Sequence, residues 1–299
     1  MSHKKIVITG ASGFLGSHLV RRMLGNGQYE VYALSSKPEQ LKEKISGENI
    51  IYCYKDDLNA EMLKDSNVIS CAYPRNSTGI AVADGLKYIK NVFEVAVESE
   101  ASAIINISSQ SVYSQLRTEA ATEETELCLE SPYAVGKYAV ELMLESICKW
   151  SKTKYTSLRM ASLIGPGFDQ RIVNRFVKQA METGKLTVKK NQQRFGFFDV
   201  EDAVSGIVAM LGVNKLLWKP VYNLGGEGSY TLTEIAEIVK KVVTAKAGKR
   251  VEINVIEGEE IGNSEIDAGL FGEEFGSLQV HTLRESIERI CQSTRLDKE

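Results

Sequence analysis

The stretch "KKIVITGASGFLGSHLV", residues 4–20, predicts a β-strand, a tight turn and an α-helix in direct succession. Its first part, residues 4–9, is a short β-branched apolar run that ends at a glycine, as buried strands do. Apolar residues then recur at helical spacing until Gly25. A second strand-like run, residues 29–35, completes a β–α–β unit.

The turn in this unit carries the glycines Gly10, Gly13 and Gly16 in a Gly-x-x-Gly-x-x-Gly pattern. In a dinucleotide-binding turn the first glycine permits the tight turn, and the second lets the backbone approach the pyrophosphate. The third allows close packing of helix on strand, and the helix N-terminus attracts the pyrophosphate charge. Because these glycines stand between a predicted strand and a predicted helix, the sequence predicts a dinucleotide cofactor.

The end of the second predicted strand bears on which dinucleotide binds. A carboxylate there accepts hydrogen bonds from the adenosine ribose 2′-hydroxyl and favours NAD. This chain instead has Ser35, Ser36 and Lys37 at that place. Lys37 is able to pair with the 2′-phosphate of NADP; the alternative is a solvent-facing loop residue. We therefore expect NAD(P) as the cofactor, with a slight preference for NADP.

The composition is that of a soluble globular protein. The chain has 299 residues, of which 43% are apolar and 25% charged, and its formal net charge is −3. This length suggests one large domain or two modest ones. The charge gives no general attraction to nucleic acid or an anionic membrane, and no run approaches the ~18 apolar residues of a membrane-spanning helix. We expect a cytoplasmic protein with a small-molecule substrate and with neither nucleic acid nor membrane as partner.

The cysteines and histidines give no reason to expect a metal. The cysteines are scattered, odd in number and lack a Cys-x-x-Cys pair, which is typical of reduced thiols. The chain has only three histidines, so a histidine-centred metal site or catalytic triad is not expected.

The rest of the chain continues the alternation of strands and helices, which predicts a doubly wound parallel sheet of the α/β class. Further strand-like runs cover residues 49–54, 66–73, 102–108 and 155–160, with helical stretches at 79–98 and 132–150. Later elements are a helix near 170–183, a strand over 194–200, a helix over 201–212, a strand over 221–226, a helix from Thr231 and a strand over 251–256. We expect a dinucleotide-binding domain of residues 1–160 plus about 195–222, and a smaller lobe of about 161–194 plus 223–299.

A tyrosine and a lysine four residues apart, Tyr133 and Lys137, share one face of the helix predicted over 132–150. An ammonium group beside a phenol lowers the pKa of the phenol, which makes it a general base toward an alcohol. The alternative is an ordinary amphipathic helix with a surface lysine. Tyrosines 113 and 155 also stand four residues before an arginine, so the spacing alone does not choose among the pairs.

Short motifs follow one another along the chain: "TGASGFLG" (9–16), "DDL" (56–58), "SSQSVY" (108–113), "PYAVGK" (132–137), "RMASLIGPG" (159–167), "RFGFFDVEDA" (194–203) and "YNLGG" (222–226). In this order they resemble the extended short-chain dehydrogenase/reductases and, more narrowly, the NAD-dependent epimerase/dehydratase family. The resemblance covers nearly the whole chain and implies a Rossmann-type sheet with a smaller C-terminal α/β substrate lobe. It places a catalytic Tyr-x-x-x-Lys on the helix after the fifth strand, which selects Tyr133 and Lys137 and leaves the other two pairs structural.

The resemblance also implies roles for the residues at these motif positions. Tyr133 exchanges a proton with a substrate hydroxyl, and Lys137 makes that phenol more acidic and binds the nicotinamide ribose. Ser109, or its neighbour Ser108, holds the substrate oxygen while hydride passes to or from C4 of the nicotinamide. The implied cofactor contacts are Gly10, Ser12, Gly13, Phe14, Leu15, Gly16, Ser35, Ser36, Lys37, Asp57, Leu58, Cys71, Ala72, Tyr73, Tyr133, Lys137 and Met160. The implied substrate contacts are Ser109, Gln110 and Arg194.

The chain departs from the family pattern at places that bear on the reaction. Where 4,6-dehydratases have an Asp–Glu pair, it has Gln110 and Ser111, which disfavours dehydration and leaves epimerisation, or simple reduction or oxidation. Family members that use nucleotide sugars commonly hold the diphosphate with arginines. Arg194 fits the first of these, but residues 256–269, where the second is expected, are acidic and contain no arginine. Tyr73 stands where the family usually has alanine and narrows the site.

The leading expectation is therefore an NAD(P)-dependent nucleotide-sugar epimerase. The missing arginine and Lys37 keep open an NADPH-dependent carbonyl reductase whose substrate carries no nucleotide. The fold alone also suits a non-catalytic dinucleotide sensor. Because the family is often dimeric through the helices after strands four and five, a homodimer through the partly apolar run 80–97 is a further expectation.

Overall fold

The structure is a computed structural model that describes residues 3–74, 78–276 and 280–296. The chain divides into two compact units. The first comprises Met1–Val112, Cys128–Arg159 and Val208–Tyr222, and the second comprises Tyr113–Leu127, Met160–Ile207 and Asn223–Glu299. Each unit therefore draws on three separate stretches of chain.

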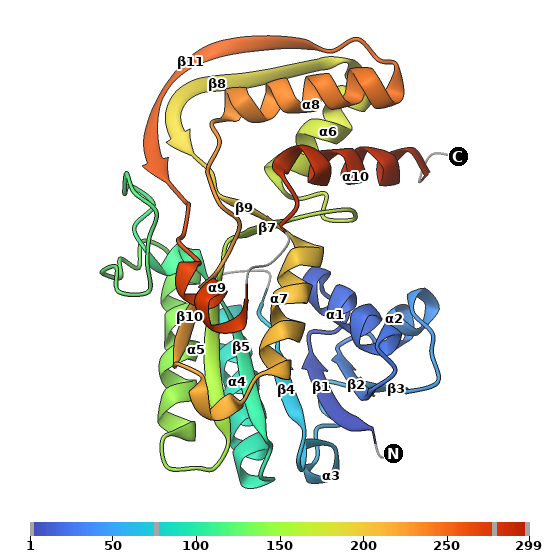
Figure 1. Cartoon of the computed structure of the whole chain (residues 1–299), viewed down its shortest axis with the longest axis vertical. Coiled ribbons are helices and arrows are strands. Elements are labelled where there is room, and N and C mark those ends of the chain that lie inside the picture. Colours follow the sequence, from blue (N-terminus) through green and yellow to red (C-terminus); the bar gives the residue numbers. More distant parts are fainter. Residues whose placement is uncertain (1–2, 75–77, 277–279, 297–299) are drawn as a thin grey trace. The chain divides into compact units, whose positions relative to one another are not determined.

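A seven-stranded sheet with strand order β10-β6-β5-β4-β1-β2-β3 is the centre of the α/β fold (Figure 1). Its strands are β1 (Lys4–Thr9), β2 (Tyr29–Ser35), β3 (Ile50–Tyr54), β4 (Asn67–Ser70), β5 (Ala103–Ser109), β6 (Lys154–Met160) and β10 (Val221–Leu224). β1 pairs in parallel with β2 and β4, and parallel pairing continues to β3 and β5. The predicted α/β class with a doubly wound parallel sheet is confirmed. The strand order reverses at β1, so the carboxyl ends of β1 and β4 form the switch point where such sheets bind ligands.

Helices flank this sheet and bury its apolar strands. They are α1 (Phe14–Gly25), α2 (Pro38–Lys44), α3 (Ala60–Leu63), α4 (Gly79–Glu98) and α5 (Pro132–Cys148). The helix predicted over 79–98 is confirmed as α4, which lies beside α5 (Figure 1) and buries Val92 and Phe93 against strand residues such as Val68. Ile80, at the start of α4, is exposed, and a homodimer through this run stays a prediction. No helix in the described part of the chain has both the length and the apolar character needed to cross a membrane.

Helix α5 begins where the sequence predicts it. Ser131 Oγ accepts a hydrogen bond from the Ala134 N–H at 3.2 Å, and Pro132 takes the first helical position. The helix ends at Cys148, slightly before the expected residue 150. Lys137 and Glu141 are both buried on it, so two charged side chains lie within an otherwise apolar face.

The second unit is built around a parallel strand pair and a helical core. β8 (Lys185–Arg194) pairs with β11 (Glu252–Asn263), and the pair curves beside α8 (Figure 1). The helices packed here are α6 (Ile172–Thr183), α8 (Leu232–Ala247) and α10 (Leu283–Leu296). The smaller elements are β7 (Ser162–Ile164), which pairs with β9 (Phe197–Asp199), and α9 (Gly269–Phe275). The helix α7 (Val200–Gly212) follows β9 and belongs to the second unit up to Ile207 and to the first from Val208.

Residues 194–200 do not form the single strand that the sequence predicts. β8 ends at Arg194 and β9 begins at Phe197, with Gly196 buried between them. A Cβ atom at Gly196 would lie 2.9 Å from the Cα of Glu265, so the chain breaks its strand where it passes another segment closely. The sequence assigned 195–222 to the first unit; Val208–Tyr222 belong to it, whereas the residues up to Ile207 belong to the second.

Asn223 explains why residues 113–127 group with the second unit, although the sequence placed them with the first. Its buried side chain accepts a hydrogen bond from the Tyr113 hydroxyl at 2.8 Å. It donates to the carbonyl groups of Ala121 at 2.8 Å and Asp267 at 3.0 Å. Buried amide groups need such pairing, and here the pairing fixes the 113–127 segment to the C-terminal part of the chain.

Candidate active site

The glycine turn between β1 and α1 is pressed against the segment that follows β4. Gly10 has a left-handed backbone with φ of 64°, and a Cβ atom there would lie 2.8 Å from the Ala72 nitrogen. A Cβ atom at Gly16 would lie 2.9 Å from the Cα of Ala11 and would overlap the Gly10 carbonyl oxygen. Both positions therefore exclude side chains, and the glycine at position 10 lets the turn lie against Ala72 at the switch point of the sheet.

The start of α1 fits the pyrophosphate of a dinucleotide. Gly13 is the N-cap and provides no side-chain cap, and the first turn of the helix contains no acidic residue. A helix N-terminus carries partial positive charge and amide groups that lack partners within the helix, so it favours an anion. The predicted turn, which runs from Gly10 through Ser12 and Phe14 to Gly16, is thus suited to the cofactor by both shape and charge.

Ser35, at the end of β2, joins this strand to the glycine turn. Its hydroxyl donates a hydrogen bond to Ser12 Oγ at 2.7 Å and accepts one from the Lys37 N–H at 2.9 Å. Ser35 is buried, whereas Ser36 and Lys37 are exposed beyond the strand. The Ser35 hydroxyl is therefore used within the protein, and the Lys37 ammonium is the group that an anion can reach.

Asp57 and Leu58 lie in the turn after β3. Asp57 Oδ2 accepts a hydrogen bond from the Tyr54 N–H at 2.7 Å, and the Asp57 N–H donates to the Tyr54 carbonyl at 3.0 Å. The Asp57 side chain is exposed, and Leu58 packs partly against the core of the first unit. The carboxylate thus stabilises its own turn, and its contact with adenine stays a prediction.

Tyr133 and Lys137 occupy one face of α5, with the ammonium nitrogen 5.8 Å from the centre of the Tyr133 ring. Lys137 is buried, and its Nζ donates a hydrogen bond to the Ile107 carbonyl of β5 at 2.8 Å. Burial lowers the pKa of Lys137 to about 8, against the raising effects of Cys71 and Glu141. Tyr133 is half-buried. A phenol that solvent can reach therefore has a cationic neighbour at neutral pH, as a general acid/base requires.

The segment Cys71–Tyr73 lies between the two parts of the candidate site. Ala72 touches Gly10 of the glycine turn. On the other side, Cys71 interacts electrostatically with Lys137, and the Tyr73 ring centre lies 4.2 Å from the Lys137 ammonium. One short segment of the first unit therefore contacts both the predicted cofactor turn and the predicted acid/base pair.

The two serines at the end of β5 differ in what their hydroxyl groups contact. Ser108 is buried and donates a hydrogen bond to Glu141. Ser109 is half-buried and accepts hydrogen bonds from the Ser111 N–H at 3.2 Å and the Ser111 hydroxyl at 3.0 Å. Of the two positions that the motif left open, Ser109 is the accessible one, and its neighbour Gln110 is buried.

Beneath Ser108, Glu141 forms a buried ion pair with Arg159 of β6. Arg159 Nη2 lies 2.7 Å from Glu141 Oε2, and Arg159 Nε lies 3.2 Å from each carboxylate oxygen. Only 6% and 8% of the arginine and glutamate side chains are exposed. Motif spacing did not indicate this pair. The signal that the sequence offered was that Glu141 and Arg159 each stand within an apolar run. The contact supports the structural role expected of Arg159 and places a carboxylate one helical turn from Lys137.

Arg194 and Met160 belong to the second unit and not to the unit of the glycine turn. Arg194 Nε donates a hydrogen bond to Ser229 Oγ at 3.0 Å, and another guanidinium nitrogen donates to the Ser229 carbonyl. Arg194 Nη1 also lies 3.8 Å from Glu234 Oε2. Met160 is buried at the end of β6. A diphosphate that binds Arg194 therefore has to compete with protein groups.

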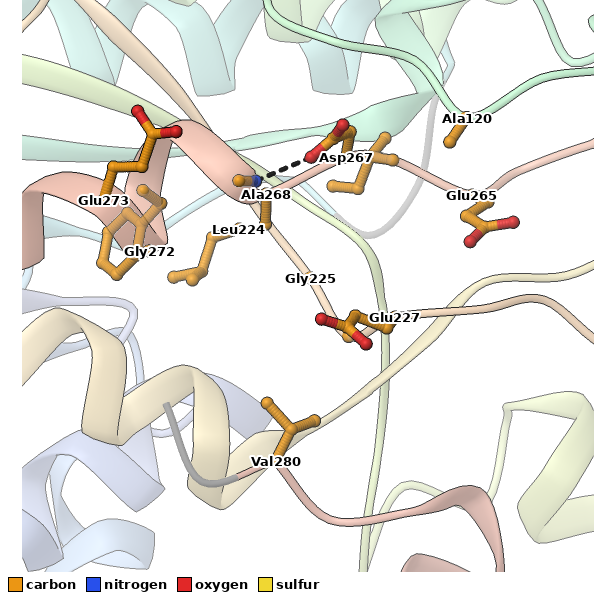
Figure 2. Close-up of a pocket in the computed structure, with 14 residues that line it drawn as sticks. Ala120, Leu224, Gly225, Glu227, Glu265, Asp267, Ala268, Gly272, Glu273 and Val280 are labelled. Carbon is orange, nitrogen blue, oxygen red and sulfur yellow. Dashed lines mark hydrogen bonds between the residues drawn. The ribbon is translucent and has the colours of Figure 1, made fainter. Parts of the chain in front are cut away.

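A cavity of about 600 Å³ within the second unit is rich in carboxylates. Figure 2 shows the acidic side chains that line it, together with Leu224 and Val280; they are Glu227, Glu265, Asp267 and Glu273. Asp267 Oδ1 accepts a hydrogen bond from the Gly269 N–H at 2.7 Å. The four carboxylates keep their negative charge, which disfavours an anionic ligand in this cavity, in line with the acidic character read from residues 256–269.

The sequence of this chain is similar to that of known proteins over most of its length. Residues 6–225 match the sequence model of the NAD dependent epimerase/dehydratase family. A protein of Bacillus subtilis (strain 168), described as the uncharacterized UDP-glucose epimerase YtcB, is 27% identical over 269 residues, which cover 81% of this chain and 83% of that protein. UDP-glucuronic acid decarboxylase 6 of Arabidopsis thaliana is 26% identical over 277 residues, which cover 86% of this chain and 78% of the relative.

A solved structure with the same fold holds both a cofactor and a nucleotide sugar. It is a mutant UDP-glucuronic acid 4-epimerase from Bacillus cereus, in complex with UDP-4-deoxy-4-fluoro-glucuronic acid and NAD. The match covers 98% of this chain and 99% of that one, with a TM-score of 0.83 and 24% identity. At this identity the likeness establishes the fold alone.

Proposed function

Because this chain belongs to the NAD-dependent epimerase/dehydratase family, we propose that it is a nucleotide-sugar epimerase in which Tyr133 is the general acid and base. The observation that carries this proposal is the buried Lys137 ammonium beside Tyr133, with the segment Cys71–Tyr73 in contact with both this ammonium and the glycine turn. The names of the compared proteins, which are UDP-sugar epimerases and a decarboxylase, support the substrate class.

The residues present fit a bound NAD(P). The turn around Gly13 would hold the pyrophosphate at the start of α1, and the Lys137 ammonium would donate a hydrogen bond to the nicotinamide ribose. Lys37 would contact a 2′-phosphate if NADP is the form that binds. When bound, the nicotinamide supplies a hydride acceptor that also returns the hydride.

The protein's own groups handle the proton and the substrate oxygen. Tyr133 takes the proton of a sugar hydroxyl as that carbon is oxidised, and the Lys137 charge stabilises the phenolate. Ser109 donates a hydrogen bond to the same oxygen as it becomes a carbonyl. After the keto sugar rotates, Tyr133 returns the proton and the epimer forms. Gln110 and Ser111 offer no carboxylate for the removal of water, which favours epimerisation over dehydration.

The test is incubation of the purified protein with NAD or NADP and, in separate reactions, UDP-glucose, UDP-N-acetylglucosamine and UDP-glucuronic acid. We expect one of them to give its 4-epimer in the NMR spectrum, without a net change in the absorbance of reduced nicotinamide. Release of carbon dioxide would assign a decarboxylase instead, and loss of water would assign a dehydratase. Failure to convert any nucleotide sugar would overturn the proposal.

A second candidate is an NADPH-dependent carbonyl reductase whose substrate has no nucleotide. The observations that favour it are the contacts of Arg194 with Ser229 and Glu234 and the carboxylates around the cavity of the second unit. Both features weaken the case for a diphosphate in that unit. Net consumption of NADPH with a panel of aldehydes and ketones, and no isomerisation of nucleotide sugars, would select this reaction.

Replacement of Lys37 tests the form of the cofactor. We expect Lys37→Glu to raise the Kd of NADPH about tenfold or more, because the exposed ammonium then no longer pairs with a dianionic 2′-phosphate. The Kd of NADH is expected to change little. Fluorescence titration with each reduced cofactor measures both constants, and Lys42→Glu on α2, also exposed, is the matched control. Equal effects on NADH and NADPH would contradict a contact with the 2′-phosphate.

A further inference from the structure

We propose that Tyr73 is a positioning residue that holds the Lys137 ammonium and the Tyr133 ring in their working arrangement. The role of Tyr73 in catalysis rests on the proposed function, whereas its effect on the pKa of Lys137 is measurable without substrate or cofactor. The sequence marked Tyr73 as an implied cofactor contact and as a bulky replacement that narrows the site. Its contacts assign it a more specific role.

Tyr73 contacts both members of the acid/base pair. Its ring centre lies 4.2 Å from Lys137 Nζ, well inside the roughly 6 Å range of a cation–π interaction. The Tyr73 and Tyr133 rings meet edge to face, with centres 5.2 Å apart and planes at 81°. The Tyr73 hydroxyl also lies 3.5 Å from the Tyr133 carbonyl oxygen. One side chain therefore covers the lysine and limits the movement of the tyrosine.

The helix that carries the pair is shaped to accept Tyr73. A Cβ atom at Gly136, the residue before Lys137, would overlap the Tyr73 hydroxyl oxygen. The next nearest atoms to that Cβ are Tyr73 Cζ and Val82 Cγ1, both at 3.4 Å, which is ordinary contact. A glycine at 136 and a tyrosine at 73 are therefore complementary, and among the contacts of the described residues it is the Tyr73 hydroxyl group that excludes a side chain at 136.

Covering Lys137 changes its acid–base behaviour. The groups that face its ammonium are the thiol of Cys71 and the ring of Tyr73 from the segment after β4, the carbonyl of Ile107 from β5, and Tyr133 and Glu141 from α5 itself. Burial is the main cause that lowers the pKa of Lys137 to about 8. Burial and the neighbouring Tyr133 raise the pKa of Tyr73 to about 12, so its ring covers the ammonium as a neutral phenol.

Removal of the ring admits water to the ammonium and therefore raises the pKa of Lys137. The lost cation–π attraction acts in the opposite direction, by about 1.5 pKa units for a desolvated ammonium. It is the smaller effect, because relief of burial can return the Lys137 pKa from about 8 toward the ordinary 10.5. In Tyr73→Phe the ring remains, and the Lys137 pKa is expected to stay near the wild-type value. Gly136→Ala displaces the Tyr73 hydroxyl, and with it the ring, and is expected to act like Tyr73→Ala. In the double variant Tyr73→Phe/Gly136→Ala the new methyl group fits.

The experiment is a pH titration of Lys137 by NMR, using protein labelled with ¹³Cε-lysine and Lys137→Met to assign the signal. We expect a midpoint near 8 for the wild type, for Tyr73→Phe and for the double variant. The midpoint of Gly136→Ala and of Tyr73→Ala is expected about one pH unit higher. The high-pH limb of the kcat profile should move in the same direction in these two variants.

The double variant separates positioning from a general loss of packing. If the midpoint shifts as much in Tyr73→Phe/Gly136→Ala as in Gly136→Ala alone, the proposal is wrong. It is also wrong if no variant shifts the midpoint. A wild-type midpoint at the ordinary lysine value, near 10.5, would also overturn it. Because the titration uses neither cofactor nor sugar, these outcomes are distinct from failure of the epimerase proposal, which the turnover assay reports.

Discussion

Tyr133→Phe is expected to lower kcat about 10³-fold, because proton transfer by a positioned side chain contributes roughly 10²–10⁴-fold to a rate. The ring and its edge-to-face contact with Tyr73 remain, so the local structure is kept. The measurement is the initial rate of epimer formation at saturating nucleotide sugar, together with the Kd of the reduced cofactor by fluorescence. We expect the Kd to change little.

The matched control is Tyr138→Phe on the same helix, one residue after Lys137. Tyr138 is half-buried as Tyr133 is, but it stands outside the Tyr-x-x-x-Lys motif. Its kcat is expected to stay within about twofold of the wild type, as for most substitutions remote from the reacting atoms. Undiminished turnover by Tyr133→Phe would show that another group transfers the proton.

Arg159→Met is expected to lower the free energy of unfolding by about 3–5 kcal/mol, the usual cost of removing one partner from a buried ion pair. Glu141 then keeps the hydrogen bond from Ser108 but loses the guanidinium that contacts both of its oxygens. Unfolding in urea, followed by circular dichroism, measures the difference. Lys152→Met is the control, since its pair with Glu100 is 3.6 Å long and both side chains are largely exposed; we expect less than about 1 kcal/mol.

The double variant Arg159→Met/Glu141→Leu is expected to recover most of that loss, because apolar side chains of similar volume often replace a buried pair at little cost. If the free energy of unfolding recovers, the unpaired Glu141 carboxylate is the cause of the destabilisation in Arg159→Met. If the double variant is as unstable as the sum of the two single variants, the loss arises from packing instead.

The fold was largely predictable because its elements carry local signals. The strand before Gly10 and the helix after the glycine turn are buried apolar patterns of the expected periods. α5 starts at the predicted position because Ser131 and Pro132 determine a helix start through their own chemistry. β8 was missed because its apolar alternation is limited to Leu186 and Val188, and the six residues that follow them are polar and not buried.

The candidate site was predictable to the extent that its residues share a short motif. Tyr133 and Lys137 lie together because the helix repeat brings residues four apart to one face. The choice between Ser108 and Ser109 depended on Glu141, a residue from another element whose approach no local pattern reports.

The same limit applies to the contacts of Arg194 and Tyr73. Arg194 meets Ser229, and Tyr73 lies over Lys137, only because the chain folds back on itself. Such long-range pairings depend on packing between elements distant in sequence. A single sequence states the residue type at each position and leaves these neighbours undetermined.

The hydrogen bonds of Asn223 have a consequence for synthesis of the protein. Tyr113 and Ala121 emerge from the ribosome long before Asn223, and Asp267 emerges later still. The seven-stranded sheet likewise waits for β10. Contacts between such remote positions form late, because a long loop must close first. The nascent chain therefore exposes an incomplete sheet edge for most of its translation, and its refolding rate should be governed by closure of these loops.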